Sequence, residues 1–124
     1  MSQPAAKPAE PVLLRDDRDG ICTLTLNRGP QRNSLSEALM AALTDELAAI
    51  ARAPSVRVVV LAANGPAFSA GHDLKELTAH RTDADRGRAY YQKIMKQCSV
   101  LMQAIVRLPK PVIARVHGIA TAAG

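Results

Sequence analysis

Apolar residues alternate with polar ones near the start of this chain, and the alternation predicts a β-hairpin. The segments 12–15 and 21–26 flank Asp19-Gly20, a dipeptide typical of two-residue hairpin turns. One face of the second segment is apolar and is formed by Cys22, Leu24 and Leu26. We therefore expect two paired strands, with that face turned toward a core.

The apolar period changes to that of a helix after residue 33. One stripe at helical spacing is formed by Leu35, Leu39, Leu43, Leu47 and Ile50. Ser34 and Glu37 stand at capping-box spacing, so we expect the helix to begin there. Pro54 restricts the residue that precedes it, so we expect the helix to end near Ala53.

Further strands and helices alternate along the rest of the chain. Residues 58–61 are apolar at every position, which is typical of a parallel strand covered on both faces. A short helix and then a long one over residues 86–108 should follow, before Pro109 and Pro111 introduce a strand over residues 112–116. The apolar stripe of the long helix, more typical of a core than of cofactor contacts, is formed by Tyr91, Ile94, Met95, Cys98, Leu101, Met102, Ile105 and Leu108. The order predicts an α/β fold with three long strands and one hairpin strand.

The composition narrows the possible partners. Only 2% of the residues are aromatic and 48% are hydrophobic, so the core must be built from aliphatic side chains. The formal net charge of +5 is compatible with nucleic acid or a phosphorylated ligand. Because the basic residues are scattered and no aromatic residues lie among them, we expect no nucleic-acid partner. An ordinary solvated surface, with one local basic cluster that meets a phosphate, fits better.

The cysteines and the first residues of the chain indicate in which cellular compartment the protein is expected. Cys22 and Cys98 have no close partner in sequence, so they are expected to be core residues in a reducing environment. Residues 1–11 are rich in Pro and Ala and lack an apolar signal core, which predicts a disordered tail. No apolar run approaches the length of a membrane span. We therefore expect a cytoplasmic protein without a membrane partner.

Two turns of small residues follow predicted strands. Residues 68–76 read Phe-Ser-Ala-Gly-His-Asp-Leu-Lys-Glu, and residues 117–124 read His-Gly-Ile-Ala-Thr-Ala-Ala-Gly. A tight turn of small residues exposes backbone N–H groups and lets a ligand approach the main chain. Two such donors that converge can hold the oxygen of a thioester as it becomes an enolate.

These segments together resemble the crotonase (enoyl-CoA hydratase/isomerase) superfamily. Its members carry F-S/A-A-G-x-D-L/I-K-E, a long helix and K-P-V-I-A-x-V-x-G, which residues 68–76 and 110–118 match. Residues 27–36 are similar to the family's L-N-R-P-x-x-R-N-A-L-S segment. The resemblance implies an α/β, crotonase-like ββα spiral fold, truncated before the second half of its core. Residues 12–124 would then form the N-terminal part of an acyl-CoA-binding domain.

The resemblance also implies roles for individual residues. The backbone N–H groups of His72 and Ala123 would form the oxyanion hole, although Ala122-Ala123-Gly124 stands where the family has G-G-G. The implied coenzyme A contacts, with Arg28 as a weaker candidate, are Arg32, Ser34, Ala70, Asp73, Leu74 and Lys75. Coenzyme A is part of the substrate, so no separate cofactor is expected. The spacing of His, Cys, Asp and Glu supports no metal site.

Simpler roles remain open for several of these residues. For the His72 imidazole the simpler role is that of a solvent-facing group without a function, because the implied role belongs to its backbone. For Asp73 the simpler role is to cap the following helix, and for Lys75 it is that of a solvated charge. His117, at the end of a strand, is expected to be structural.

The reaction itself depends on residues outside these motifs. Hydratases of the family use two glutamates that follow the second turn, and Glu37, Glu46 and Glu76 do not occupy matching positions. The resemblance therefore implies an enoyl-CoA hydratase/isomerase-like protein of fatty acid metabolism that acts on acyl-CoA thioesters, with these 124 residues as an incomplete, inactive fragment. The alternative is a non-catalytic acyl-CoA-binding or regulatory module. The parent protein is expected to be a homotrimer or hexamer.

Overall fold

A hairpin opens the part of the chain that the structure describes, which is residues 10–124 of a computed structural model. The predicted tail therefore lies outside the described residues, except for its last two positions. Strands β1 (Leu13–Arg18) and β2 (Ile21–Leu26) pair antiparallel around the Asp19-Gly20 turn. The prediction of the hairpin is confirmed, although its first strand begins one residue later than expected and continues three residues further toward the turn.

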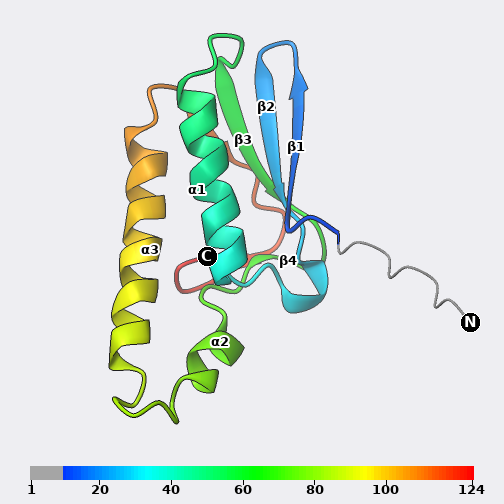
Figure 1. Ribbon diagram of the computed structural model, residues 1–124. Helices are drawn as coiled ribbons and strands as arrows, with labels where there is room; N and C mark the ends of the chain where they lie inside the picture. The colour runs from blue at the N-terminus through cyan, green and yellow to red at the C-terminus, as the bar shows by residue number, and fades with distance from the viewer. Residues whose placement is uncertain (1–9) are drawn as a thin grey trace, which may run out of the picture.

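Four strands form the main sheet in the order β1-β2-β3-β5 (Figure 1). Strand β3 (Val58–Ala63) runs parallel to β2 on one side and to β5 (Val112–Ala114) on the other. The last strand is shorter than the predicted 112–116, and Val116 is 54% exposed. Val59 is buried while Val60, on the opposite face of β3, is only half-buried. Ala62, on the same face as Val60, is buried, so the second face of the strand is covered only in part.

A second, two-stranded sheet was not expected from the sequence. Strands β4 (Ala67–Ser69) and β6 (Ile119–Ala120) pair in parallel, which brings the last residues of the chain beside residues 67–69 (Figure 1). Each strand leads directly into one of the two small-residue turns. The pairing therefore brings together two turns that lie about fifty residues apart in the sequence.

Three helices accompany the sheets: α1 (Glu37–Ala51), α2 (Leu74–Ala79) and α3 (Arg88–Arg107). A short 3-10 turn, η1 (Gly29–Gln31), follows β2. Helices α1 and α3 lie side by side on one face of the main sheet, and α2 extends from the end where α3 begins (Figure 1). None of the described helices is long and apolar enough to cross a bilayer.

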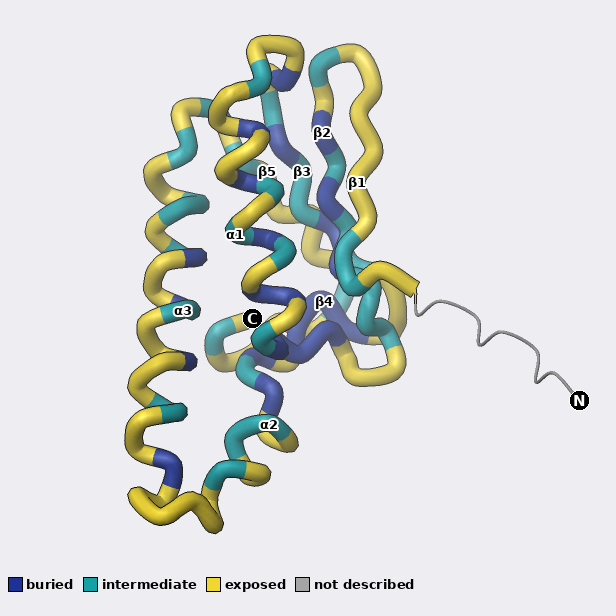
Figure 2. Tube along the Cα trace, in the orientation of Figure 1, coloured by how far each residue is buried: buried dark blue, intermediate teal, exposed yellow. Residues whose placement is uncertain are grey.

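The core lies between α1, α3 and the inner face of the sheet. Buried residues recur on the inward sides of both helices, along the whole of α1 and in the middle of α3 (Figure 2). The predicted stripe of α1 is buried throughout, whereas α3 buries only Ile94, Cys98 and Leu101. Met95 was expected on the buried face but is 48% exposed. The contact of α3 with α1 is therefore narrower than its apolar stripe.

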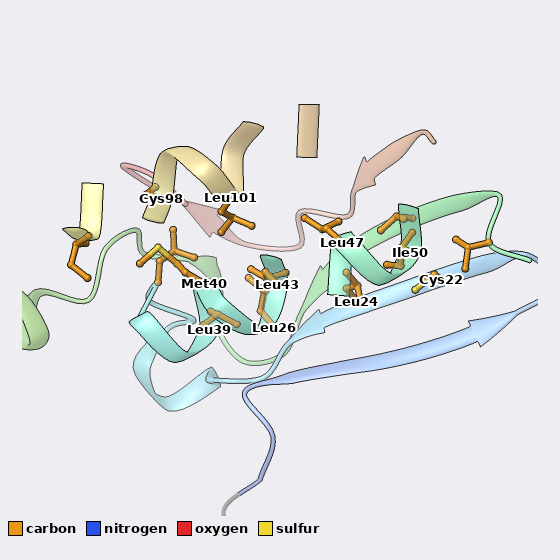
Figure 3. Close-up of a cluster of buried hydrophobic side chains, with 14 residues drawn as sticks. Cys22, Leu24, Leu26, Leu39, Met40, Leu43, Leu47, Ile50, Cys98 and Leu101 are labelled. Atoms are coloured by element: carbon orange, nitrogen blue, oxygen red, sulfur yellow. The ribbon is translucent and has the colours of Figure 1, made fainter. Parts of the chain in front are cut away.

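Both cysteines belong to this core, as the sequence predicted. Figure 3 shows Cys22 beside Ile50 and Cys98 beside Leu101, among aliphatic side chains. Burial, with a smaller contribution from Asp17, raises the pKa of the Cys22 thiol to about 11. The thiol is therefore protonated near neutral pH and is a poor nucleophile.

The predicted start of α1 was wrong in detail. The helix is capped by Ser36, whose hydroxyl accepts a hydrogen bond from the Leu39 N–H at 3.2 Å. Ser34 lies before the helix and uses its side chain for other contacts. Glu37 carries its carboxylate to α3 instead of closing a capping box, since its oxygens accept hydrogen bonds from Tyr90 and Lys93.

Candidate functional site

The first small-residue turn, residues 69–73, is paired with the segment 32–35. The Leu35 N–H donates to the Gly71 carbonyl at 2.7 Å, and the Asp73 N–H donates to the Leu35 carbonyl at 3.4 Å. These two bonds form a parallel β-bridge between Leu35 and residue 72. In a parallel bridge the residue that is straddled directs its own N–H and C=O to the opposite side.

The geometry of this bridge leaves the backbone N–H of His72 available to a ligand. It points away from Leu35, and none of the hydrogen bonds recorded among residues 10–124 uses it as a donor. Gly71 precedes His72 and has a φ of +87°, a backbone conformation that residues with a Cβ rarely adopt. The glycine therefore produces the turn that exposes this donor.

The second turn, residues 121–124, packs directly against the first. The Thr121 N–H donates to the Ser69 carbonyl at 3.1 Å, and the Gly124 N–H closes the turn on the Thr121 carbonyl at 2.8 Å. A Cβ built on Gly71 would lie only 3.2 Å from the backbone nitrogen of Ala123. That nitrogen has no hydrogen-bond partner among the residues that the structure describes. Two free N–H donors therefore stand on adjoining turns.

An apolar cavity of about 190 Å³ opens beside the second turn. Its walls come from both sheets, from α1 and α3 and from the turn itself, and include Leu35, Phe68, Leu101, Met102, Ile105 and Ala123. The cavity is thus adjacent to one of the two free donors. An apolar space beside backbone donors suits a ligand that has an apolar part next to a polarised oxygen.

Two of the predicted coenzyme A contacts, Ser34 and Asp73, are buried beneath the first turn. Each is only 9% exposed. Asp73 Oδ1 accepts hydrogen bonds from the backbone N–H groups of Lys75 at 3.0 Å and Glu76 at 3.2 Å, which confirms that Asp73 caps α2. Its other oxygen, Oδ2, accepts from Arg28 at 3.2 Å and from the Ser34 hydroxyl at 3.3 Å. Their side chains therefore brace the turn from inside.

The environment keeps the Asp73 carboxylate ionised. Burial acts to raise its pKa, but the Glu76 N–H, then Arg28 and Ser34, outweigh that effect, and the pKa of Asp73 lies below its ordinary value. The ion pair with Arg28 is well shielded from solvent, with side-chain exposures of 17% for Arg28 and 11% for Asp73.

The other predicted contacts lie on the outer side of the same turn. Arg32, Ala70, Leu74 and Lys75 are all exposed. His72 is half-buried, and its Nδ1 atom is buried with no partner among the described residues, so the imidazole is not simply a solvent-facing group. His117 places Nε2 2.7 Å from the Gly65 carbonyl, which agrees with the expected structural role.

Asn33 is a residue of this site that the sequence reasoning did not single out. It is fully buried with a φ of +52°. Its Nδ2 donates to the carbonyls of Asn64 at 2.7 Å and Ala67 at 3.0 Å, and its Oδ1 accepts from the Arg28 N–H at 2.8 Å. Asparagine is enriched at positive φ, which is the one signal in the sequence that points to such a position.

The glutamates considered for acid–base chemistry are engaged elsewhere. Lys93, and after it Tyr90, hold the pKa of Glu37 below its usual range. Glu46 pairs with Arg15 at 2.9 Å, and Glu76 accepts a hydrogen bond from the Glu37 N–H at 2.9 Å. No group of three or more His, Cys, Asp or Glu side chains within residues 10–124 is arranged to hold a metal ion.

Comparisons with known proteins identify relatives along almost the whole chain. The family model for enoyl-CoA hydratase/isomerase matches residues 16–124. The rat enoyl-CoA hydratase domain-containing protein 3, mitochondrial, is 38% identical over 124 residues, which cover 99% of this chain and 40% of the rat protein. The 1,2-epoxyphenylacetyl-CoA isomerase of Escherichia coli (strain K12) is 34% identical over 107 residues, covering 85% of this chain and 39% of that enzyme.

Solved structures agree with the sequence relatives. A crystal structure of enoyl-CoA hydratase from Mycobacterium smegmatis matches with a TM-score of 0.83 and 57% identity, over 93% of this chain and 43% of that protein. The crotonase-like fold class predicted from the motifs is thus confirmed. The chain spans about 40% of the length of the curated relatives that it matches.

Proposed function

The chain belongs to the enoyl-CoA hydratase/isomerase family, and from this premise we propose that it binds an acyl-CoA thioester between its two turns. The thioester oxygen would accept hydrogen bonds from the backbone N–H groups of His72 and Ala123. The observation that carries this proposal is that neither donor has a hydrogen-bond partner within residues 10–124 and that the turns bearing them are in contact.

This placement explains what the site offers chemically. When a proton leaves the carbon next to a thioester, or when water adds to the neighbouring double bond, negative charge accumulates on the carbonyl oxygen. Two backbone donors already aimed at that oxygen stabilise the charge without reorganising, and each typically contributes about 2.7–4 kcal/mol. The apolar cavity beside Ala123 offers space for part of the acyl chain.

The nucleotide end of the ligand would lie on the outer side of the first turn. Arg32 and Lys75 are exposed there and carry the positive charge that suits a phosphate. Ala70 and Leu74 offer backbone and apolar surface beside them, while Ser34 and Asp73 support the turn from beneath. Because coenzyme A is part of the substrate, this proposal requires no separate cofactor.

We further propose that these 124 residues bind the thioester without turning it over. Glu37, Glu46 and Glu76 are held by other contacts, and a positioned acid or base is typically worth about 10²–10⁴-fold in rate. The same observation favours a second candidate, a non-catalytic acyl-CoA-binding or regulatory module. In the whole protein the reaction would be a hydration or an isomerisation of an acyl-CoA.

Two expectations about the whole protein stay predictions. One is assembly into a homotrimer or hexamer. The other is a cytoplasmic location, although the name of the rat relative assigns that protein to mitochondria.

A titration with two readouts tests the proposal. The purified 124-residue chain is titrated with a short 2-enoyl-CoA by calorimetry, and loss of the enoyl-thioester absorbance is followed in the same samples. We expect saturable binding without loss of absorbance. The binding proposal is wrong if the folded chain ignores the thioester at millimolar concentration. Turnover above background would overturn the proposed inactivity and exclude the non-catalytic alternative.

A further inference from the structure

We propose that Arg28 is a positioning residue of the thioester site, which acts through Ser34 and Asp73 to fix the direction of the His72 N–H. The inference rests on the proposed function, because it assigns a role within that same site. It replaces the weaker expectation that Arg28 contacts coenzyme A.

The guanidinium of Arg28 joins the two strands of the bridge that exposes the donor. Its Nη1 donates to the Ser34 carbonyl at 2.6 Å and to the Ser34 hydroxyl at 2.9 Å, and its Nη2 donates to Asp73 Oδ2 at 3.2 Å. Ser34 immediately precedes Leu35, and Asp73 immediately follows His72. One planar group therefore spans the pair of residues, Leu35 and His72, that form the bridge.

This connection needs the geometry of arginine and not only its charge. A guanidinium presents several N–H donors in a rigid fork, whereas an ammonium group is a compact point charge. Arg28 uses two of its nitrogens at once, on two segments of the chain. A lysine at this position would keep the ion pair with Asp73 but could not hold the spacing between both segments.

The backbone of Arg28 is itself held in place. Its N–H donates to Asn33 Oδ1 at 2.8 Å, and its carbonyl accepts from the Asn33 N–H at 2.9 Å. The three hydrogen bonds of the side chain described above are internal, and only 17% of the side chain is exposed. The guanidinium is thus committed to the turn and is not presented to a phosphate in solution.

The two carboxylate oxygens of Asp73 serve different partners. This allows a positioning role of Arg28 to be distinguished from a purely structural one. Oδ1 caps α2 through Lys75 and Glu76, while Oδ2 receives Arg28 and Ser34. Removing the guanidinium therefore leaves the helix cap in place. What is lost is the connection between residue 34 and residue 73, and with it the restraint on the N–H that lies between them.

Infrared spectroscopy of a bound thioester measures that restraint directly. A short acyl-CoA labelled with carbon-13 at the thioester carbonyl is added to the 124-residue chain, and the stretching frequency of the bound carbonyl is recorded. Hydrogen bonds from the two turns lower this frequency relative to the free thioester. The variants are Arg28→Met, Arg28→Lys and, as a matched control, Arg15→Met. Arg15 also links two segments of the chain, because it pairs with Asp17 at 2.8 Å on the hairpin and with Glu46 at 2.9 Å on α1, but neither segment belongs to the bridge.

We expect the carbonyl frequency in Arg28→Met to return toward that of the free thioester. Affinity should fall on the order of tenfold, which is the low end of the loss for residues that orient the ligands of a metal site. Arg28→Lys should melt closer to the wild type yet still lose the frequency shift, and Arg15→Met should keep it. A wild-type frequency in either Arg28 variant overturns the inference, and Arg28→Lys decides if Arg28→Met does not fold. A wild-type chain that binds no thioester, or binds it with an unshifted carbonyl, overturns the proposed function instead.

Discussion

The two turns of the site offer the same group, a free backbone N–H, but they are built differently. The turn at residues 69–73 is joined to residues 32–35 by five hydrogen bonds, and three of its five residues are buried. Among the described residues, the hydrogen bonds that join residues 121–124 to the first turn all come from Thr121, and three of these four residues are exposed. The first donor is fixed by the chain around it, whereas the second is fixed only by contact with the first turn.

The backbone conformations show the same contrast. The first turn uses Gly71 at a φ of +87°, where glycine is nearly free of strain. The second turn uses Ala122 at a φ of +51°, a region that costs a residue with a Cβ roughly 1–2 kcal/mol. The turn with fewer contacts is therefore also the more strained one.

Gly71→Ala should have the largest effect, because it damages both turns at once. The added Cβ would lie 2.9 Å from the Ala122 Cβ and 3.1 Å from the Thr121 carbonyl oxygen, in addition to the strain of a positive φ. We expect thioester binding to be lost and the free energy of unfolding to fall by at least about 1–2 kcal/mol. Calorimetric titration and urea denaturation measure the two effects.

Gly87→Ala is the matched control for that change. Gly87 also has a φ of +87°, and its added Cβ would lie 2.8 Å from the His80 carbonyl oxygen, at the start of α3. It should lose a similar amount of stability and keep binding. If both variants bind equally well, or if both fail, the contact between the two turns is not what sustains the site.

The poorly covered region around the second turn should also make the isolated chain self-associate. Ile113 is 55%, Val116 54% and Ile119 66% exposed along the segment that leads to this turn. We expect Val116→Lys to reduce the apparent mass in light scattering. Val106→Lys, at an 83% exposed position on α3, should not. A monodisperse wild-type monomer would contradict this account.

Ala122→Gly should strengthen the second turn. Relief of the positive φ is worth roughly 1–2 kcal/mol, from which the extra freedom of glycine in the unfolded chain subtracts about 0.4–1 kcal/mol. A net gain of up to about 1.6 kcal/mol in urea denaturation is expected. Ala123→Gly, at a position without a positive φ, should be destabilising instead. Equal effects of the two changes would show that strain at residue 122 is not what weakens this turn.

The same difference between local and distant contacts explains how far the sequence could predict the fold. The stripe of α1 and the Asp19-Gly20 turn depend on neighbouring residues, and both were predicted. The strands β4 and β6 were missed because two or three residues carry no periodicity, and their pairing joins segments about fifty residues apart. The use of Ser36 and not Ser34 as the helix cap depends on a distant contact. Arg28 donates a hydrogen bond to the Ser34 hydroxyl, while the Ser36 hydroxyl accepts from the Leu39 N–H.

The candidate site likewise has a part that the sequence predicted and a part that it did not. Its two turns were located through motifs, and their small residues gave a physical reason for the backbone donors. The support beneath them was not predicted, because Arg28 and Asp73 are 45 residues apart in the sequence and no local pattern connects them. Burial of Ser34 and Asp73 shows that a residue in a binding motif can serve the turn from inside.

Acid should weaken the first turn through Asp73. Its pKa is lower in the folded chain than the ordinary value of 3.8, so its stabilising contribution is complete above that value and is lost as the pH falls through the lower folded pKa. The melting temperature of the wild type should exceed that of Asp73→Asn at neutral pH, and the difference should narrow below about pH 4. Glu37→Gln serves as a positive control for this pH dependence, because the pKa of Glu37 is also lowered in the folded chain. A difference that is constant with pH would show that the charge of Asp73 does not stabilise the turn.

The smallest expected effects concern the outer side of the first turn, where only exposed charges meet the ligand. Lys75→Ala and Arg32→Ala should each weaken coenzyme A binding by a few-fold, since exposed ion contacts are typically worth about 0.2–1 kcal/mol. The loss should shrink with added salt and with dephospho-coenzyme A, because the attraction is electrostatic. Lys96→Ala, which changes an exposed lysine on α3, is the matched control.

His72→Ala removes the imidazole and keeps the backbone N–H, so it should weaken binding less than Gly71→Ala does. If His72→Ala abolished binding while Lys75→Ala and Arg32→Ala changed nothing, the half-buried imidazole and not the backbone would be the group that the ligand requires.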